Sequence, residues 1–280
     1  MAGKRPRTSL CRVDDSRKPQ LAYSDSQALM LDEKSRRAKA AKTAAVVQHF
    51  RGTSDLSGLR VLDVGCSGGI VADELTNHGA EMIGLDIDVP GLAKAQARFG
   101  TRIPFLCADS ERMPFGDETV DVIICNHVYE HVVDPARLFS EMRRVVKSDG
   151  LLYLGLGNRM GVMEPHYRLP FLSWLPRPAA HRYVRAFGRA EYYHEAFTTR
   201  AGLRELCDGL FVWDYTYSVL TDPLTFAATD VVPGWLSRAP QSVLRAGRPL
   251  VPTYIWVATK RNVAPAGPPT AMLPELVRAP

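Results

Sequence analysis

Three aspartates at the ends of apolar runs have the residue type and the spacing expected of a ligand-binding site. Asp63, Asp86 and Asp109 lie 23 residues apart, and Asp63 belongs to VLDVGCSGG (61–69), where an apolar run meets a glycine-rich turn. Glycines at such a turn let the backbone approach a ligand closely and open the following helix toward it. If the runs are parallel strands, their carboxyl ends meet at one edge, where carboxylates can accept hydrogen bonds from ribose hydroxyls. The pattern predicts a crevice for a nucleoside-like ligand.

The glycine turn departs from the pattern of dinucleotide-binding proteins. Counted from Gly65, the G-x-G-x-x-G fingerprint requires glycine where Ser67 and Ile70 stand. Those glycines allow the tight turn and the close approach of a pyrophosphate, so a dinucleotide is disfavoured. A nicotinamide-dependent oxidoreductase is kept as an alternative hypothesis.

Three segments resemble the class I S-adenosylmethionine-dependent methyltransferases, and most closely their type 11, ubiquinone/menaquinone-biosynthesis-like branch. They are VLDVGCSGG (61–69), GLDID (84–88) and ADSERMPFGDETVDVIICNHVYEHVVDP (108–135). The likeness covers about residues 55–156, and Ser67 replaces a glycine that is usual in the family. The resemblance implies a Rossmann-like fold, S-adenosyl-L-methionine as cofactor and methyl transfer as the activity. A methyltransferase-like binding protein that has lost catalysis is a further alternative.

The resemblance also implies which residues contact the cofactor. Asp63 would support the ammonium group, Asp86 would hold the ribose, and Asp109 would accept from the adenine amino group. Asp63 and Asp109 also have a structural interpretation, as carboxylates that satisfy backbone amides in a turn. The implied cofactor-binding residues are Asp63, Gly65, Ser67, Gly69, Asp86, Ile87, Asp109, Ser110 and Asn126.

Histidines are the candidates for a general base. Methyl transfer mostly requires alignment of a nucleophile, because the sulfonium already activates the methyl group, but a base helps when the acceptor is a hydroxyl. His127 follows the fourth predicted strand, and His166 and His194 lie on predicted loops; for each, simple packing is the alternative. The five cysteines have no metal-ligand spacing, and we expect no metal.

The elements that position these residues alternate between strands and helices. Short apolar runs stopped by glycine or polar residues predict strands at 60–64, 81–86, 103–109, 120–126, 151–156, 211–217 and 253–259. Helical patterns are found at 32–50, 70–78, 90–99, 135–147 and 199–208. This order predicts an α/β fold with a doubly wound, mostly parallel, seven-stranded Rossmann-like sheet. An irregular lid insertion is expected after strand 5, and another between strands 6 and 7.

The ends of the chain differ from its middle. Residues 1–42 carry 11 basic and 5 acidic residues, whereas the rest of the chain has a net charge of −1. A nucleic-acid partner is therefore not expected, because it requires a basic face on the folded body. The organisation we expect is a disordered basic tail (1–25), a single methyltransferase domain (26–262) with a cofactor half (55–156) and a lid-rich substrate half (157–250), and a mobile proline-rich tail (263–280).

The sequence also bears on location. It contains no run of 18 apolar residues, and its charged start lacks the apolar core of a secretory signal. Five cysteines, an odd number without a disulfide pattern, are expected to be reduced thiols. These features predict a cytoplasmic protein.

The substrate half combines arginines with aromatic residues. Six arginines lie within 157–190, among aromatic residues such as Phe171 and Trp174, and three more lie within 218–250. The mixture suits an anionic and partly apolar acceptor or a membrane surface, although a lid with solvated arginines has the same composition. We expect a small-molecule acceptor that is lipid-linked, saccharide-type or quinone-like, with peripheral contact at the inner membrane surface.

Overall fold

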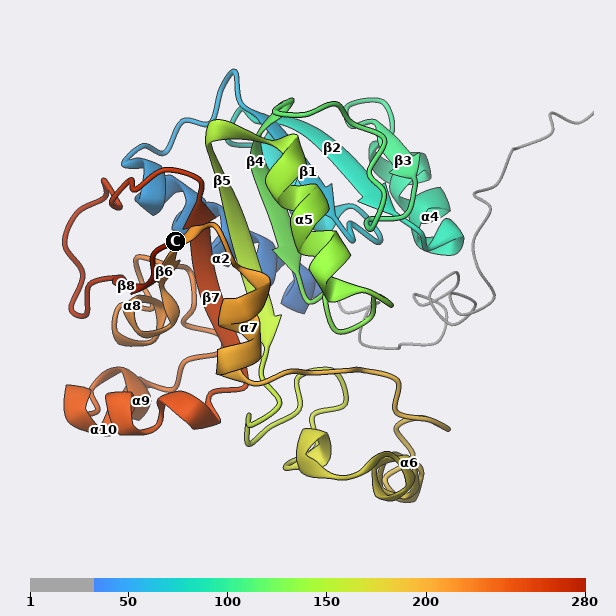
Figure 1. The fold of residues 1–280 in the computed structure, drawn as a ribbon, viewed down its shortest axis with the longest axis vertical. Helices are drawn as coiled ribbons and strands as arrows, with labels where there is room; N and C mark the ends of the chain where they lie inside the picture. The colour runs from blue at the N-terminus through green and yellow to red at the C-terminus, as the bar shows by residue number, and fades with distance from the viewer. Residues whose placement is uncertain (1–32) are drawn as a thin grey trace, which may run out of the picture.

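The strands of the computed structural model, which describes residues 33–280, form one sheet (Figure 1). They are β1 (Arg60–Val64), β2 (Glu81–Asp86), β3 (Phe105–Cys107), β4 (Val120–Asn126), β5 (Val146–Gly157), β6 (Phe211–Asp214), β7 (Thr253–Thr259) and β8 (Glu275–Arg278). Their order is β3-β2-β1-β4-β5-β7-β6-β8; the first five run parallel, and β7, β6 and β8 pair antiparallel. The predicted doubly wound, mostly parallel Rossmann-like sheet is confirmed. The predicted tail over 1–25 lies outside the described residues.

The eighth strand corrects the prediction of seven strands and of a mobile tail over 263–280. Strand β8 pairs with β6, with Leu276 opposite Trp213, and Met272 just before it is buried. Without this pairing β6 would be an open edge with unpaired backbone groups. Four of the five prolines in 263–280 precede the strand and Pro280 follows it, so none of them interrupts its hydrogen bonds.

Helices cover both faces of the sheet. They are α2 (Glu33–Arg51), α3 (Ile70–Thr76), α4 (Val89–Phe99), α5 (Pro135–Val145), α6 (Arg177–Ala186), α7 (Arg200–Leu206), α8 (Thr216–Thr221), α9 (Gly234–Ser237) and α10 (Gln241–Ala246), with 3-10 turns η3 (Leu172–Trp174) and η4 (Arg248–Leu250). Asp88 and Asp134 cap α4 and α5, each accepting from a backbone N–H three residues ahead, with proline in the first turn. The start of both helices is therefore determined by the capping aspartate and by the proline that follows it.

Successive residues of the central strands point to opposite faces. Leu62 and Ile123 pack in the cluster that includes α5 and α7, whereas Val61 and Val122 pack in the cluster that includes α2, α3 and α8. Because both clusters are closed to solvent, β1 and β4 are buried on both faces, and their sequences are therefore almost continuously apolar.

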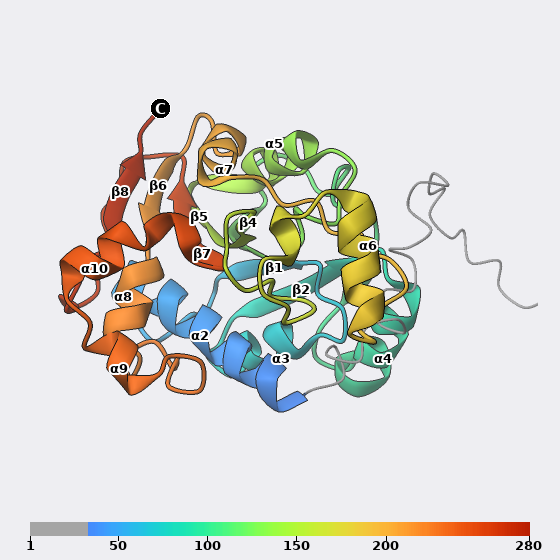
Figure 2. The same cartoon turned by 90° about the horizontal axis from the view of Figure 1, so that it is seen from below.

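Two long connections lie at the carboxyl ends of the parallel strands. One, between β5 and α7, holds η3 and α6, and the other, between β6 and β7, holds α8, α9 and α10. Seen from below, α6 lies on one side of this end of the sheet and α9 and α10 on the other (Figure 2). The second connection is more helical than predicted, because its helices of four to six residues are too short to show a period.

Candidate functional site

The turn between β1 and α3 contains three residues in the left-handed region. Gly65, Ser67 and Gly69 have φ of 73°, 47° and 75°. A Cβ on Gly65 would stand 2.5 Å from Cγ2 of Val128, and one on Gly69 would stand 2.8 Å from the ring of Phe105. Both glycines are therefore needed for conformation and for space. Ser67 adopts the left-handed conformation with a side chain, at the position where the resemblance expects glycine.

Asp86, at the end of β2, ties this turn to the next one. Its Oδ2 accepts from the N–H of Ser67 at 2.7 Å, and its Oδ1 accepts from the N–H groups of Ile87 at 2.7 Å and Asp88 at 2.8 Å. Burial raises the pKa of Asp86, and the backbone donors oppose that rise. Three amides thus fix the carboxylate at the edge of the sheet, as recognition of ribose hydroxyls requires.

A crevice follows the carboxyl ends of β1, β2 and β3 and collects most of the predicted cofactor residues. One part is lined by Gly65, Ser67, Asp86, Ile87, Asp109 and Ser110. An adjoining part is lined by Asp63, Gly65 and Asn126. Gly69 lines neither part, and its close approach to Phe105 makes it a packing residue.

Asp63 and Arg36 mark the charged end of the crevice. Asp63 is buried, and its Oδ2 has no hydrogen-bond partner among residues 33–280. Burial raises the pKa of Asp63 to about 7, while the charge of Arg36 lowers it and that of Asp86 raises it. Arg36, which comes from α2, was not predicted from the sequence and lines the same part of the crevice. An unsatisfied carboxylate oxygen and a guanidinium at one end of a crevice suit the ammonium and carboxylate groups of an amino acid.

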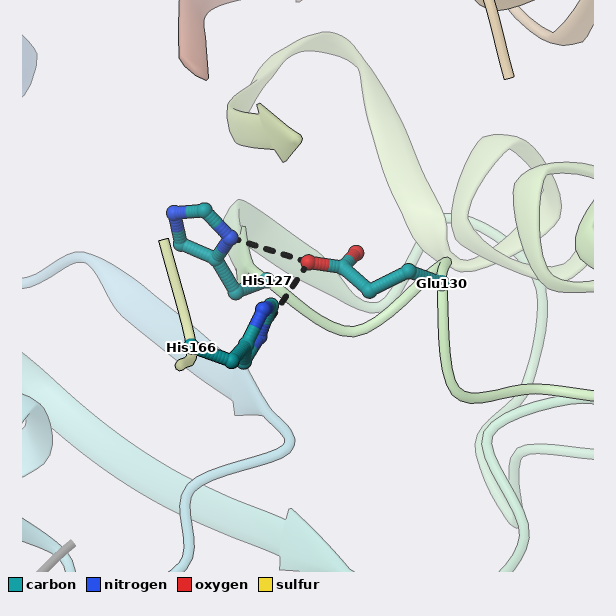
Figure 3. Close-up of side chains that lie close together, drawn as sticks. All are labelled: His127, Glu130 and His166. Atoms are coloured by element: carbon teal, nitrogen blue, oxygen red, sulfur yellow. Dashed lines mark hydrogen bonds and ion pairs between the residues drawn. The ribbon is translucent and has the colours of Figure 1, made fainter. Parts of the chain in front are cut away.

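A cluster of imidazoles around one carboxylate, the His127 cluster, lies where β4 ends. Nδ1 of His127 lies 2.9 Å from Oε1 of Glu130, and Nε2 of His166 lies 3.6 Å from the same oxygen (Figure 3). Nε2 of His131 lies 3.3 Å from Nε2 of His166. His127 has a φ of 57°, an uncommon conformation for a residue other than glycine. The structure therefore brings together two of the predicted catalytic histidines, His127 and His166.

The outer ring nitrogens in the cluster also have partners. Nδ1 of His166 lies 2.9 Å from Oε1 of Glu164, and Nε2 of His127 lies 3.4 Å from Oγ1 of Thr253. Burial lowers the pKa of His127, His131 and His166 to about 3, so these imidazoles are neutral at pH 7. Neutral imidazoles have one ring nitrogen with a lone pair, which can accept a proton or bind a metal ion.

Three of these side chains form a grouping that could hold a metal ion. One ligand atom each from His127, Glu130 and His166 lie within 4.8 Å of one another. No metal was expected from the sequence because the cysteines lack metal-ligand spacing. His166 comes from the connection after β5, far along the chain from His127 and Glu130.

The third predicted histidine lies elsewhere. His194 is exposed, its carbonyl accepts from Arg177, and its N–H donates to Glu195. It lines neither the crevice nor the cavity described next. Its backbone, rather than its ring, supports the connection between β5 and α7.

An apolar cavity of about 730 Å³ lies on the other side of His127, beneath α8, α9 and α10. Its walls include Val219, Leu220, Val232, Trp235, Leu244 and Ile255. Two cations of α2, Lys39 and Lys42, also line it. Lys42 is buried with no ion pair among the described residues, and burial lowers its pKa. Arg36, Lys39 and Lys42 are spaced three residues apart, so they lie along one face of α2. This spacing is visible in the sequence and could have indicated that the three cations act at one site.

Comparison with known proteins adds three findings. A family model described as a methyltransferase domain, of type 11, matches residues 62–154. Ubiquinone biosynthesis O-methyltransferase of Azorhizobium caulinodans is 28% identical over 179 residues, which are 59% of this chain and 69% of that protein. The protein of the same name from Brucella ovis is 32% identical over 176 residues, 60% of this chain and 67% of that protein.

A solved structure supports the fold. The S-adenosylmethionine-dependent methyltransferase from Mesorhizobium loti matches with a TM-score of 0.50 at 19% identity, over 73% of this chain and 92% of that one. Within residues 33–280, no helix has the length and apolar character needed to span a membrane.

Proposed function

This chain belongs to the type 11 family of class I S-adenosylmethionine-dependent methyltransferases, and on that premise we propose that it methylates a hydroxyl of a lipid-linked or quinone-like small molecule. The position of His127 carries the proposal. This residue lines both parts of the cofactor crevice and also the apolar cavity. An acceptor held in the cavity meets the cofactor at His127, where its reacting oxygen can be aligned.

The charged end of the crevice fits the cofactor. When bound, S-adenosyl-L-methionine supplies a methyl group on a positively charged sulfur, which a nucleophile can attack without further activation. Asp86 would hold the ribose hydroxyls, and the unsatisfied oxygen of Asp63 would accept from the ammonium group. Arg36 would bind the carboxylate of the methionine part. The chain therefore has a partner for each polar end of this molecule.

The proton of the acceptor hydroxyl would pass to a ring nitrogen of His127 as the oxygen attacks the methyl group, because the hydroxyl becomes far more acidic during that attack. A hydroxyl is a weak nucleophile until it loses its proton, and an adjacent basic group makes that loss easier. His127 faces the cavity and is held by Glu130, which fixes the orientation of its ring. Glu130 is itself buried, so its hold on the imidazole is not weakened by solvent.

The cavity indicates the body of the acceptor. Its walls are mainly apolar, which favours a hydrocarbon or prenyl portion and disfavours a saccharide, whose hydroxyls would remain unsatisfied there. Lys39 and Lys42 would face an anionic group at the end of the cavity near α2. The relatives from Azorhizobium and Brucella, named for ubiquinone biosynthesis, support a quinone-like head group.

The outer surface around the cavity suggests where such an acceptor would be taken up. Leu224, Val231, Trp235 and Val243 are all exposed on the segment that includes α9 and α10. Apolar side chains that project from short helices next to arginines are typical of proteins that lie on membranes. We therefore include in the proposal a peripheral contact between this face and the inner membrane surface.

Calorimetric titration with S-adenosylmethionine and S-adenosylhomocysteine tests the cofactor half of the proposal. We expect micromolar binding, weakened at least tenfold (about 1.4 kcal/mol) by Asp86→Ala. Failure of both molecules to bind the folded wild-type protein would refute the proposed function.

The acceptor half is tested with dihydroxybenzenes that carry alkyl chains of increasing length. We expect mass spectrometry to detect O-methyl products, with a KM that falls as the chain lengthens. His127→Gln should lower kcat at least tenfold, whereas His78→Gln, a substitution at an α3-terminal histidine beside Glu74, should not. Equal rates for polar saccharides and alkylated phenols would contradict the assigned acceptor class.

A further inference from the structure

The His127 cluster is not satisfied by its own hydrogen bonds. The contact between His127 and Glu130 has normal length, but the 3.6 Å from Nε2 of His166 to Glu130 is too long for a hydrogen bond. Oε2 of Glu130 is buried and has no hydrogen-bond partner in the described part of the chain. Its ion-pair partners among residues 33–280 are histidines alone. Burying a carboxylate is costly unless both of its oxygens are hydrogen-bonded, and here one oxygen of Glu130 lacks such a partner among the described residues.

We propose that the cluster binds one divalent transition-metal ion, with Nδ1 of His127, Oε1 of Glu130 and Nε2 of His166 as ligands. A cation about 2.1 Å from each ligand places neighbouring ligand atoms about 3.0–3.4 Å apart, depending on whether the geometry is octahedral or tetrahedral. From Oε1 of Glu130 the observed separations are 2.9 Å to Nδ1 of His127 and 3.6 Å to Nε2 of His166, and the three ligand atoms all lie within 4.8 Å of one another. The carboxylate oxygen therefore already stands close to the required distance from both imidazole nitrogens.

The outer partners of two imidazoles match those of metal-binding histidines. Such histidines usually donate the N–H of the other ring nitrogen to a carboxylate or another oxygen, which fixes the tautomer and directs the lone pair toward the metal. Glu164 stands in that position for His166, and Thr253 stands there for His127. These contacts are independent of the cluster, because both residues lie outside it.

The chemistry of the ligand set narrows the choice of ion. Two imidazole nitrogens and one carboxylate oxygen favour Zn²⁺, Co²⁺, Fe²⁺ or Mn²⁺ over Mg²⁺ and Ca²⁺, which prefer oxygen ligands. Fivefold or sixfold coordination by such an ion leaves a position for an oxygen of the acceptor. The cavity on the far side of His127 is the source of that oxygen.

The metal site deepens the proposed function and rests on it for its chemical role. A hydroxyl oxygen bound to the cation would have a lowered pKa, so that its proton passes to water while the oxygen keeps the electron pair. The ion would thereby ionise the acceptor at the place assigned above to the cluster. It would also orient an acceptor that has two neighbouring hydroxyls.

Cobalt binding tests the site directly. Protein without a histidine tag is dialysed against a chelator, desalted and titrated with Co²⁺, with the visible absorption and the metal content per chain as readouts. We expect one Co²⁺ per chain, with absorption bands typical of nitrogen ligation. His166→Ala should weaken binding at least tenfold, and Glu164→Gln should weaken it about 10- to 100-fold, because it removes the partner that orients His166.

The control variant is His78→Gln, since His78 lies at the end of α3 beside Glu74 and lines neither the crevice nor the cavity. It should bind Co²⁺ like the wild type. Each variant is also titrated with S-adenosylhomocysteine, to confirm its fold and to separate the two proposals. If metal-free protein binds S-adenosylhomocysteine but takes up no Co²⁺, or if His166→Ala and Glu164→Gln bind Co²⁺ as tightly as the wild type, the metal site is refuted and the proposed function stands.

Discussion

Asp63 should weaken the fold of the cofactor-free protein at neutral pH, because its carboxylate is buried and one of its oxygens has no hydrogen-bond partner among the described residues. Burial raises its pKa to about 7, against a value of about 3.9 in an unfolded chain. The folded state therefore binds this proton more tightly than the unfolded state does. The resulting free-energy penalty on folding begins near pH 4, grows as the pH rises, and is complete above pH 7. A difference of about 3 pKa units corresponds to about 4 kcal/mol, and water in the crevice makes this an upper limit.

Asp63→Asn keeps the shape of the side chain and removes the charge. At pH 8 we expect the cofactor-free variant to be more stable than the wild type by up to about 4 kcal/mol, and at pH 5 by up to about 1.5 kcal/mol. A gain of 1 kcal/mol corresponds to about 2–4 °C in a chain of this size, so the melting temperature at pH 8 should rise by several degrees. The same change should weaken S-adenosylhomocysteine binding by about 10- to 150-fold, the effect of losing a hydrogen bond between charged groups worth about 1.5–3 kcal/mol.

Thermal unfolding at pH 5 and pH 8, with calorimetric titration of S-adenosylhomocysteine at pH 8, measures both effects. Asp117→Asn is the matched control, because the side chain of Asp117 is 76% exposed and should have little effect on either. If Asp63→Asn is no more stable than the wild type at pH 8, the buried carboxylate does not destabilise the fold. If the variant binds S-adenosylhomocysteine with unchanged affinity, Asp63 does not contact the ligand.

Three further predictions concern the turn, the cavity and the surface. Gly65→Ala should lower the free energy of unfolding by about 1–3 kcal/mol in urea titrations, because its Cβ would stand 2.5 Å from Val128, and adding Val128→Ala should restore part of the loss. Lys42→Met should stabilise the protein, since it removes a buried ammonium without an ion pair among the described residues, and should raise the KM of anionic acceptors while leaving that of neutral ones unchanged. Replacing Trp235 and Val243 together by serine should reduce sedimentation with phosphatidylglycerol vesicles severalfold, and equal sedimentation of variant and wild type would exclude this face as the membrane contact.

The cofactor half could be predicted from sequence because each of its signals is local. The apolar run of β1, the glycines after it and the acid at the end of β2 lie within short windows, and Asp88 and Asp134 cap their helices three residues away. One expected cofactor residue, Gly69, lines neither part of the crevice. Gly69 belongs to the motif, yet it serves the packing of Phe105, a residue of β3 whose position no short window reveals.

The features that escaped prediction depend on contacts between distant segments. Arg36 reaches the crevice from a helix that precedes the first strand, and His166 meets Glu130 from the connection after β5. The strand β8 forms because β6 offers it an open edge, although the proline-rich sequence before it is typical of a tail. The apolar cavity is built by helices too short to give a periodic pattern. In each case the feature depends on a contact with a segment far away in the sequence, and the residue types alone do not reveal that contact.

The end of β4 explains why the two halves of the molecule depend on each other. The left-handed conformation of His127 turns the chain sharply after the strand and brings Glu130 back to face its ring. The following residues then hold the substrate half: the carbonyl of Glu130 accepts from Ala196 at 2.9 Å, and the hydroxyl of Tyr129 accepts from the N–H of Thr198 at 3.2 Å. A left-handed backbone at a residue other than glycine persists only where the surrounding structure imposes it. At His127 the surroundings are the crevice, the His127 cluster and the cavity, which all meet there. A shift of the connection after β5 would therefore move His166 relative to Glu130.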